Sequence, residues 1–134
     1  MSQPETETAK WIRFANEDLR SAESLLSGGW VSYRNVCYLS QQAVEKAIKA
    51  AYVSINHVFE KSHSLDALKN QLPGEWKWKQ RFPDISPMSV WAIESRYPGD
   101  WEEATKEDAQ AALDFARKFL PVIEKEILSR LTTQ

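Results

Sequence analysis

One stretch decides the fold of this chain, and it reads QQAVEKAIKAA at residues 41–51. Almost nothing in it disfavours a helix, and its small and apolar residues recur at three- and four-residue spacings. Small side chains on one face allow a second helix to approach closely. The stretch therefore predicts a helix from about residue 31 to residue 55 that packs through a seam of small residues.

The pattern divides this helix into a core face and a more polar face. The predicted core face carries Tyr33, Cys37, Ser40, Val44, Ala47, Ala51 and Ile55. The predicted opposite face carries Tyr38, Gln42, Glu45, Lys49 and Tyr52. Glu45 and Lys49 stand one turn apart, in the order that favours an ion pair.

Apolar residues at helical spacing predict further helices on both sides of this one. The first covers about residues 8–26 and stops at the Gly28-Gly29 pair, since glycine readily takes the left-handed conformation at a helix end. A short helix begins with Ser62 as its cap, and Pro73 with Gly74 ends it.

Two more helices are predicted in the second half of the chain. A short one starts at Ser86-Pro87 and ends before Pro98, and a long one covers about residues 106–131. Thr105 and Asp108 resemble a capping box at its start. Since no strand pattern has a partner, we predict an all-α, up-and-down bundle of four to five helices, in one domain spanning residues 1–134.

Composition and charge exclude several classes of function. The net charge is −2, so a general affinity for nucleic acid is not expected. The single cysteine, Cys37, allows no intrachain disulfide and no cysteine-based metal site, and its apolar neighbours predict that it is buried. The N-terminus is polar and acidic, and no apolar run is long enough for a membrane span. We expect a cytoplasmic protein without cofactor or metal.

Five motifs, in this order, resemble the HEPN family, which is named for a nucleotide-binding domain of higher eukaryotes and prokaryotes. They are residues 15–26, residues 41–50, His63-Ser64-Leu65, Arg96-Tyr97-Pro98 and residues 105–112. The resemblance covers about residues 9–128 and implies a bundle of four or five helices that is often homodimeric. It also implies a nucleotide ligand, or a toxin–antitoxin-like pair with a minimal nucleotidyltransferase.

A ribonuclease branch of this family carries an arginine followed, after four to six residues, by a histidine. Arg96 is followed by YPGDWEE, and neither His57 nor His63 has an arginine at that spacing. Metal-free RNA cleavage needs a general base and acid with pKa values near neutrality, which histidine usually supplies. The chain instead resembles the branch with Arg-Tyr-Pro, and we predict no catalytic residue.

Polar residues in these motifs are candidates for binding an anion or a nucleotide. The candidates are Gln42, Glu45, Lys46, Lys49, His63, Arg96 and Tyr97. Lys49, His63 and Arg96 could converge on one cleft and hold a phosphate. The alternatives are structural: a solvated helix face with a Glu45–Lys49 ion pair, a histidine that caps a helix, and an arginine that braces a loop.

A second candidate surface alternates aromatic and basic residues. It consists of Trp76, Lys77, Trp78, Lys79 and Arg81, in an ordered loop or irregular helix. Such a pattern is typical of platforms on which bases stack, and equally of a surface that contacts a partner protein. It would also arise where tryptophans anchor a segment and the lysines remain solvated.

From the sequence we predict a non-catalytic binding module. It is expected to form a homodimer and to work with a nucleotide or with a small nucleotidyltransferase, and nucleic acid is not an expected partner. Two alternatives remain open. One is a divergent ribonuclease toxin in which Arg96 and His63 meet in space, and the other is a purely structural protein-interaction unit.

Overall fold

The computed structural model of the chain describes residues 3–59, 61, 64–88 and 103–132. These residues form five helices, a helical turn at residues 86–88, and no strand. The helices are α1 (Glu7–Ser27), α2 (Tyr33–Ser54), α3 (Leu65–Gln71), α4 (Lys77–Arg81) and α6 (Lys106–Thr132). The predicted all-α bundle is confirmed.

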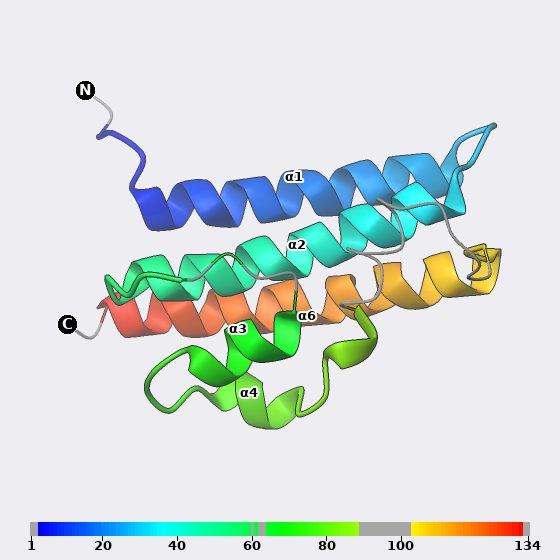
Figure 1. Cartoon of the computed structure of the whole chain (residues 1–134). Helices are drawn as coiled ribbons and strands as arrows, with labels where there is room; N and C mark the ends of the chain where they lie inside the picture. Colours follow the sequence, from blue (N-terminus) through cyan, green and yellow to red (C-terminus); the bar gives the residue numbers. More distant parts are fainter. Residues whose placement is uncertain (1–2, 60, 62–63, 89–102, 133–134) are drawn as a thin grey trace.

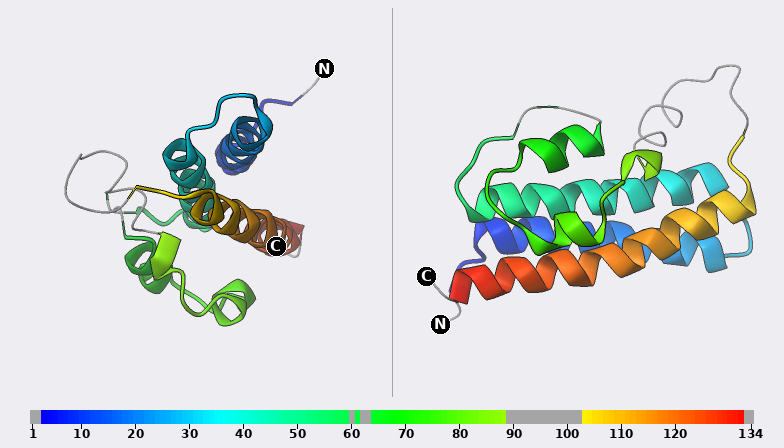
Figure 2. Two further views of the ribbon diagram at one scale, coloured as in Figure 1. Left: turned by 90° about the vertical axis from the view of Figure 1, so that its right-hand side faces the viewer. Right: turned by 90° about the horizontal axis from the view of Figure 1, so that it is seen from below.

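Three long helices lie side by side and form the body of the molecule (Figure 1). Helix α2 runs antiparallel to α1 and in the same direction as α6, so α1 begins and α6 ends at one end of the bundle. Helices α3 and α4 lie on the side of the bundle away from α1 (Figure 2). Because α2 packs extensively against both α1 and α6, it forms the centre of the fold.

Side chains at the helix starts explain where the helices begin. Thr6, Ser32 and Ser64 each accept a hydrogen bond from a backbone N–H in the first turn of α1, α2 and α3. The predicted cap of the third helix at Ser62 was therefore wrong, since Ser64 fills that position.

The predicted capping box at the start of α6 is confirmed. Asp108 accepts from the backbone N–H of Thr105 at 2.9 Å, and the hydroxyl of Thr105 accepts from the backbone N–H of Asp108 at 3.1 Å. Asp108 is one carbon shorter than the usual glutamate, yet it still reaches the Thr105 N–H. The reciprocal pair satisfies a backbone donor on each side of the helix start.

The core surrounds α2 on most of its circumference. The predicted seam of small residues is confirmed, because Ala43, Ala47 and Ala51 have no exposed surface. The assignment of Glu45 and Tyr52 to a polar outer face was wrong, as both are buried. The physical reason is that α1, α6 and α3 all pack against this helix, so few positions on α2 remain open to solvent.

The segment between α3 and α4 turns sharply and brings two tryptophans inward. Gly74 has φ 91°, a conformation that glycine adopts without steric strain. Trp76 then donates its indole N–H to the carbonyl of Pro73 at 2.9 Å. Trp78 packs edge-to-face on Phe119 of α6, with ring centroids 5.4 Å apart. These contacts attach α4 to the bundle.

None of the helices in the described part of the chain is long and apolar enough to cross a membrane.

Candidate functional site

Three of the predicted site residues lie outside the described residues: His63, Arg96 and Tyr97. Their convergence with Lys49 therefore stays a prediction. The remaining candidates lie on α2 and on the segment around α4. The structure separates them into two surfaces, since α4 lies on the side of the bundle that faces away from α1 (Figure 2).

A chain of hydrogen bonds runs along one side of α2. Gln42 donates to the side-chain carbonyl of Gln41 at 2.9 Å, and Gln41 donates to Glu45 at 3.3 Å. The other carboxylate oxygen of Glu45 accepts from the Lys49 ammonium at 3.1 Å. Glu45 is only 6% exposed, so this network satisfies a carboxylate that burial would otherwise destabilise. The predicted Glu45–Lys49 pair is confirmed, and Gln41 was missed.

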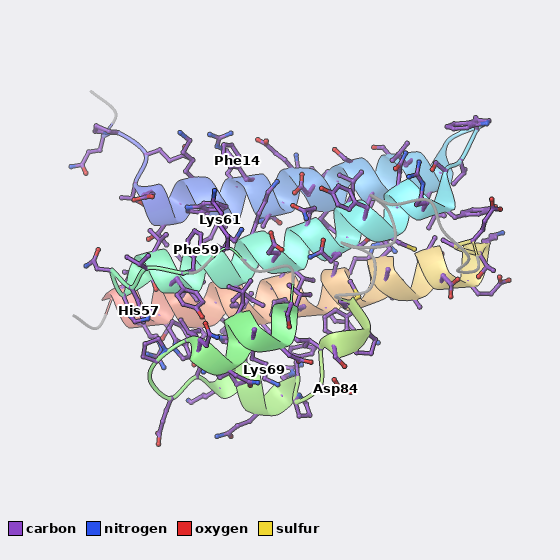
Figure 3. All side chains as sticks on the ribbon, in the orientation of Figure 1. Phe14, His57, Phe59, Lys61, Lys69 and Asp84 are labelled. Atoms are coloured by element: carbon purple, nitrogen blue, oxygen red, sulfur yellow. The ribbon has the colours of Figure 1, made fainter. Side chains whose placement is uncertain are left out.

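The Lys49 ammonium lies close to two aromatic rings that contact each other. Its Nζ is 5.7 Å from the ring centroid of Trp11 on α1 and 5.1 Å from that of Phe59. Trp11 and Phe59 pack edge-to-face at 5.8 Å, and Phe59 lies over the C-terminal part of α2 (Figure 3). The Lys49 side chain is 17% exposed. We call Lys49, Glu45, Trp11 and Phe59 the lysine niche.

Lys46 has a structural partner in the neighbouring helix. Its Nζ lies 2.6 Å from a carboxylate oxygen of Asp18 on α1, and both side chains are partly buried. The pair links the two helices with the most extensive contact in the bundle. Lys46 therefore contributes to the α1–α2 interface, and any ligand would have to compete with Asp18 for its ammonium.

A further polar contact joins α1 to α6, and the sequence did not indicate it. Asn16 donates to the carboxylate of Glu124 at 2.5 Å. Burial raises the pKa of Glu124 above its ordinary value, and the hydrogen bond from Asn16 acts in the opposite direction. The contact positions α6 against α1, so its role is structural.

The aromatic-basic segment does not present its rings to solvent. Trp76 is 2% exposed and Trp78 is fully buried, so the faces of both indoles are already covered by protein. Lys79 turns toward α3 and donates to the carbonyl of Leu72 at 2.5 Å. Its pKa is lowered, first by burial and then by the nearby Lys69. Figure 3 shows where Lys69 lies, on α3 at the lower side of the molecule, with Asp84 on the same side.

The remaining basic residues of this segment border an open groove between α4 and the C-terminal half of α6. Its volume is about 720 Å³. Lys77 and Arg81 lie on its α4 side, and Lys125 and Arg130 lie on its α6 side. We call this the basic groove. The five residues of the predicted surface therefore do not act together. Trp76 and Trp78 are buried at the base of the groove, Lys77 and Arg81 lie at its edge, and Lys79 turns away toward α3.

Glu126 of α6 attaches α4, which forms one wall of this groove, and the sequence did not indicate this contact. Its two carboxylate oxygens accept from the backbone N–H groups of Lys77 at 2.7 Å and Trp78 at 2.9 Å. The N-cap residue of α4, Trp76, offers no side-chain hydrogen bond, so a carboxylate from α6 takes that role. No local pattern reveals this, because the two segments are far apart in sequence.

Arg130 completes the groove's internal contacts. Its guanidinium lies 3.6 Å from the ring centroid of Trp76 and donates to the carbonyl of Glu75. It also lies 3.8 Å from the Glu126 carboxylate. Stacking on a buried indole fixes the plane of the guanidinium, so this cation is held in place before any ligand arrives.

Metal and thiol chemistry find no support in the described part of the chain. No group of three or more histidine, cysteine, aspartate or glutamate side chains there could hold a metal ion. Cys37 is buried as predicted, and burial raises the pKa of its thiol to about 12. The thiol therefore stays protonated near neutral pH and is a poor nucleophile.

Comparison with known proteins assigns the family. A family model described as the HEPN domain matches residues 8–127. This chain belongs to the HEPN family. A protein of Methanocaldococcus jannaschii named "Putative toxin MJ1304" is 32% identical over 130 residues, which cover 85% of this chain and 84% of the relative.

Two solved structures resemble this HEPN domain over nearly their whole length. The crystal structure of TT1696 from Thermus thermophilus has a TM-score of 0.77 and 28% sequence identity, covering 89% of this chain and 97% of its own. The structure of ST0689, an archaeal HEPN homologue, has a TM-score of 0.68 and 26% identity, covering 91% and 98%. The all-helical architecture is therefore that of solved HEPN relatives.

Proposed function

We propose that this HEPN domain is a binding module without ribonuclease chemistry, and that it acts as one member of a toxin–antitoxin-like pair with a minimal nucleotidyltransferase. In this proposal the module forms a homodimer and holds a nucleotide phosphate at the lysine niche. The observation that carries the ligand assignment is the position of Lys49, whose side chain is partly exposed and whose ammonium lies beside the ring pair of Trp11 and Phe59.

The niche has the chemistry that a phosphate requires. An ammonium has three N–H donors, and one of those of Lys49 is directed at Glu45. The other two N–H groups can donate to a phosphate oxygen. The two rings also limit the number of orientations that the Lys49 side chain adopts. A side chain that is already ordered loses less entropy on binding than a free surface lysine.

His63 and Arg96 would complete the site. His63 and Arg96 stand in two of the motifs on which the resemblance to the family depends, and each supplies donors for an anion. The lack of a histidine four to six residues after Arg96 supports binding in place of RNA cleavage. The toxin-like role is supported by the name of the Methanocaldococcus jannaschii relative.

Nucleotide binding is tested by thermal unfolding with adenine nucleotides. A ligand present at a hundred times its Kd stabilises the folded state by about 2.7 kcal/mol, so the melting temperature should rise and then saturate. Lys49→Met should abolish this rise. Lys118→Met, which removes an exposed lysine of α6, is the matched control and should respond like the wild type. A flat response of the wild-type protein to every nucleotide would refute the ligand assignment.

The relative is named a toxin, and the sequence left open a second function that fits this word, a divergent ribonuclease toxin in which Arg96 and His63 meet in space. Incubation of the purified protein with RNA distinguishes the two. We expect no cleavage. Cleavage that disappears in both Arg96→Ala and His63→Ala would establish the ribonuclease and overturn the binding proposal.

The partner and the homodimer need separate measurements. A minimal nucleotidyltransferase encoded beside this chain, when co-expressed, should co-elute with it through size-exclusion chromatography. The mass of the protein alone, measured by light scattering at tens of micromolar, should be that of a dimer. Separate elution would contradict the pairing, and a monomeric mass would contradict the homodimer.

A further inference from the structure

We propose that the basic groove between α4 and α6 binds an acidic peptide segment of a partner protein. This goes beyond the proposed function and does not depend on it, since the groove and the lysine niche share no residue. The groove lies where α4 meets the C-terminal half of α6, while Lys49 faces Trp11 of α1.

Charge is the first observation that points to an acidic ligand. Lys77, Arg81 and Lys125 border the groove and are exposed, and among the residues that the structure describes no carboxylate forms an ion pair with their side chains. Arg130 adds a fourth cation, held flat on Trp76. The whole chain has a net charge of −2, so this is a local concentration of positive charge on a weakly acidic protein.

The groove also contains two carboxylates, Glu75 and Glu126, so its four cations leave a surplus of two positive charges, and Glu126 pairs with none of the three cations at the edge. Both of its oxygens accept backbone N–H groups at the start of α4, and its only charged contact in the described residues is Arg130 at 3.8 Å. It is therefore committed to holding the groove wall. The cations at the edge remain available for a ligand's carboxylates.

The groove also has the size and the apolar surface that a peptide needs. Its volume of about 720 Å³ lies within the range of about 300–1,000 Å³ that is common for ligand sites. Val122 is partly exposed and provides apolar lining, above the buried indole of Trp76. A peptide that combines acidic and apolar side chains would match both features, with the apolar side chain as its central anchor.

Peptide is favoured over single-stranded nucleic acid for two reasons. Proteins that bind single strands stack bases on aromatic faces, and here both tryptophans are covered by protein. Gln80 and Ser129 offer both donors and acceptors, as peptide groups require.

The test is fluorescence anisotropy with a labelled peptide that alternates glutamate and leucine. The wild-type chain should bind it saturably, and the affinity should fall as salt is added, because exposed charges are screened. Lys125→Glu should weaken binding about tenfold, since it reverses a charge at the groove edge. Lys118→Glu changes the net charge equally on the same helix outside the groove, and it should stay within about twofold of the wild type.

A second variant protects the test from a folding artefact. Arg81→Glu acts from the α4 wall and should weaken binding by a similar factor, with an unchanged circular dichroism spectrum. Three outcomes would overturn the proposal: no saturable binding by the wild type, equal affinity in Lys125→Glu and Lys118→Glu, or an oligo(dT) strand that displaces the peptide and binds more tightly than it does.

Discussion

The attachment of α4 to α6 through Glu126 leads to the sharpest prediction on stability. Helix α4 has only five residues, and its first turn has no cap of its own. The carboxylate of Glu126 supplies that cap across 48 and 49 residues of sequence. Glu126→Ala removes both hydrogen bonds at once and leaves two backbone N–H groups at the start of α4 without their acceptor.

The expected loss of stability follows from the two hydrogen bonds that Glu126 accepts. A hydrogen bond to a charged group contributes about 1.5–3 kcal/mol, and a lost helix cap costs about 0.5–2 kcal/mol. The Glu126 side chain is 15% exposed, so water can reach part of the vacated space and reduce the loss. We expect Glu126→Ala to lower the free energy of unfolding by about 2–3 kcal/mol. Glu126→Gln keeps one acceptor oxygen and should cost about half as much.

Urea unfolding, followed by tryptophan fluorescence and by circular dichroism, measures this loss. Glu17→Ala is the control, because it removes an exposed carboxylate whose only ion pair in the described part of the chain is with Arg13 on the surface of α1. It should unfold at nearly the same urea concentration as the wild type. If Glu126→Ala also unfolds at the wild-type midpoint with the same slope, the cap does not hold α4 and the reasoning fails.

The remaining predictions concern the core, a helix start and a buried carboxyl. Ala47→Leu should lower the free energy of unfolding by about 1–3 kcal/mol in urea, because the seam has no room, while exposed Ala9→Leu should not. Thr105→Ala should cost about 1 kcal/mol in a thermal melt, and an unchanged melt would refute the role of the capping box. Burial raises the folded-state pKa of Glu124 above the ordinary 4.5. In the pH window between the pKa of the unfolded state and that of the folded state, the folded state therefore binds more protons. Stability should therefore fall as pH rises through this window, and Glu124→Gln should remove that fall in a series of urea titrations at different pH.

Periodicity and capping rules were sufficient to predict most of the fold. The seam around Ala47, the stop after α1 and the capping box at Thr105 all depend on residues close together in sequence. The position of the stop at Gly28 was predicted, but the left-handed conformation was wrong, because Gly28 is extended with φ −75°. The burial of Glu45 and Tyr52 was not predictable in this way. This burial depends on how many helices pack around α2. The hydrophobic pattern of α2 alone does not show how many there are.

The candidate site was predictable only in part, and for a similar reason. The Glu45–Lys49 pair lies within one helical turn, so the sequence alone indicated it. The rings around Lys49 come from α1 and from the segment after α2, and Glu126 reaches α4 from a distant helix. Contacts of this kind follow from chain topology. The sequence left open whether Trp76 and Trp78 form a stacking platform or anchor the segment, and their burial supports the second alternative.

The two walls of the basic groove differ in how firmly they are built. One is part of a 27-residue helix, and the other is a five-residue helix, a length at which an isolated helix does not persist in water. Helix α4 therefore exists only while its contacts with the bundle last. Its amide protons should exchange with deuterated solvent far earlier than those of α2, through openings that leave the three long helices intact. A ligand that contacts both walls would slow this exchange. The exchange rate of the α4 amides would therefore show whether the groove is occupied.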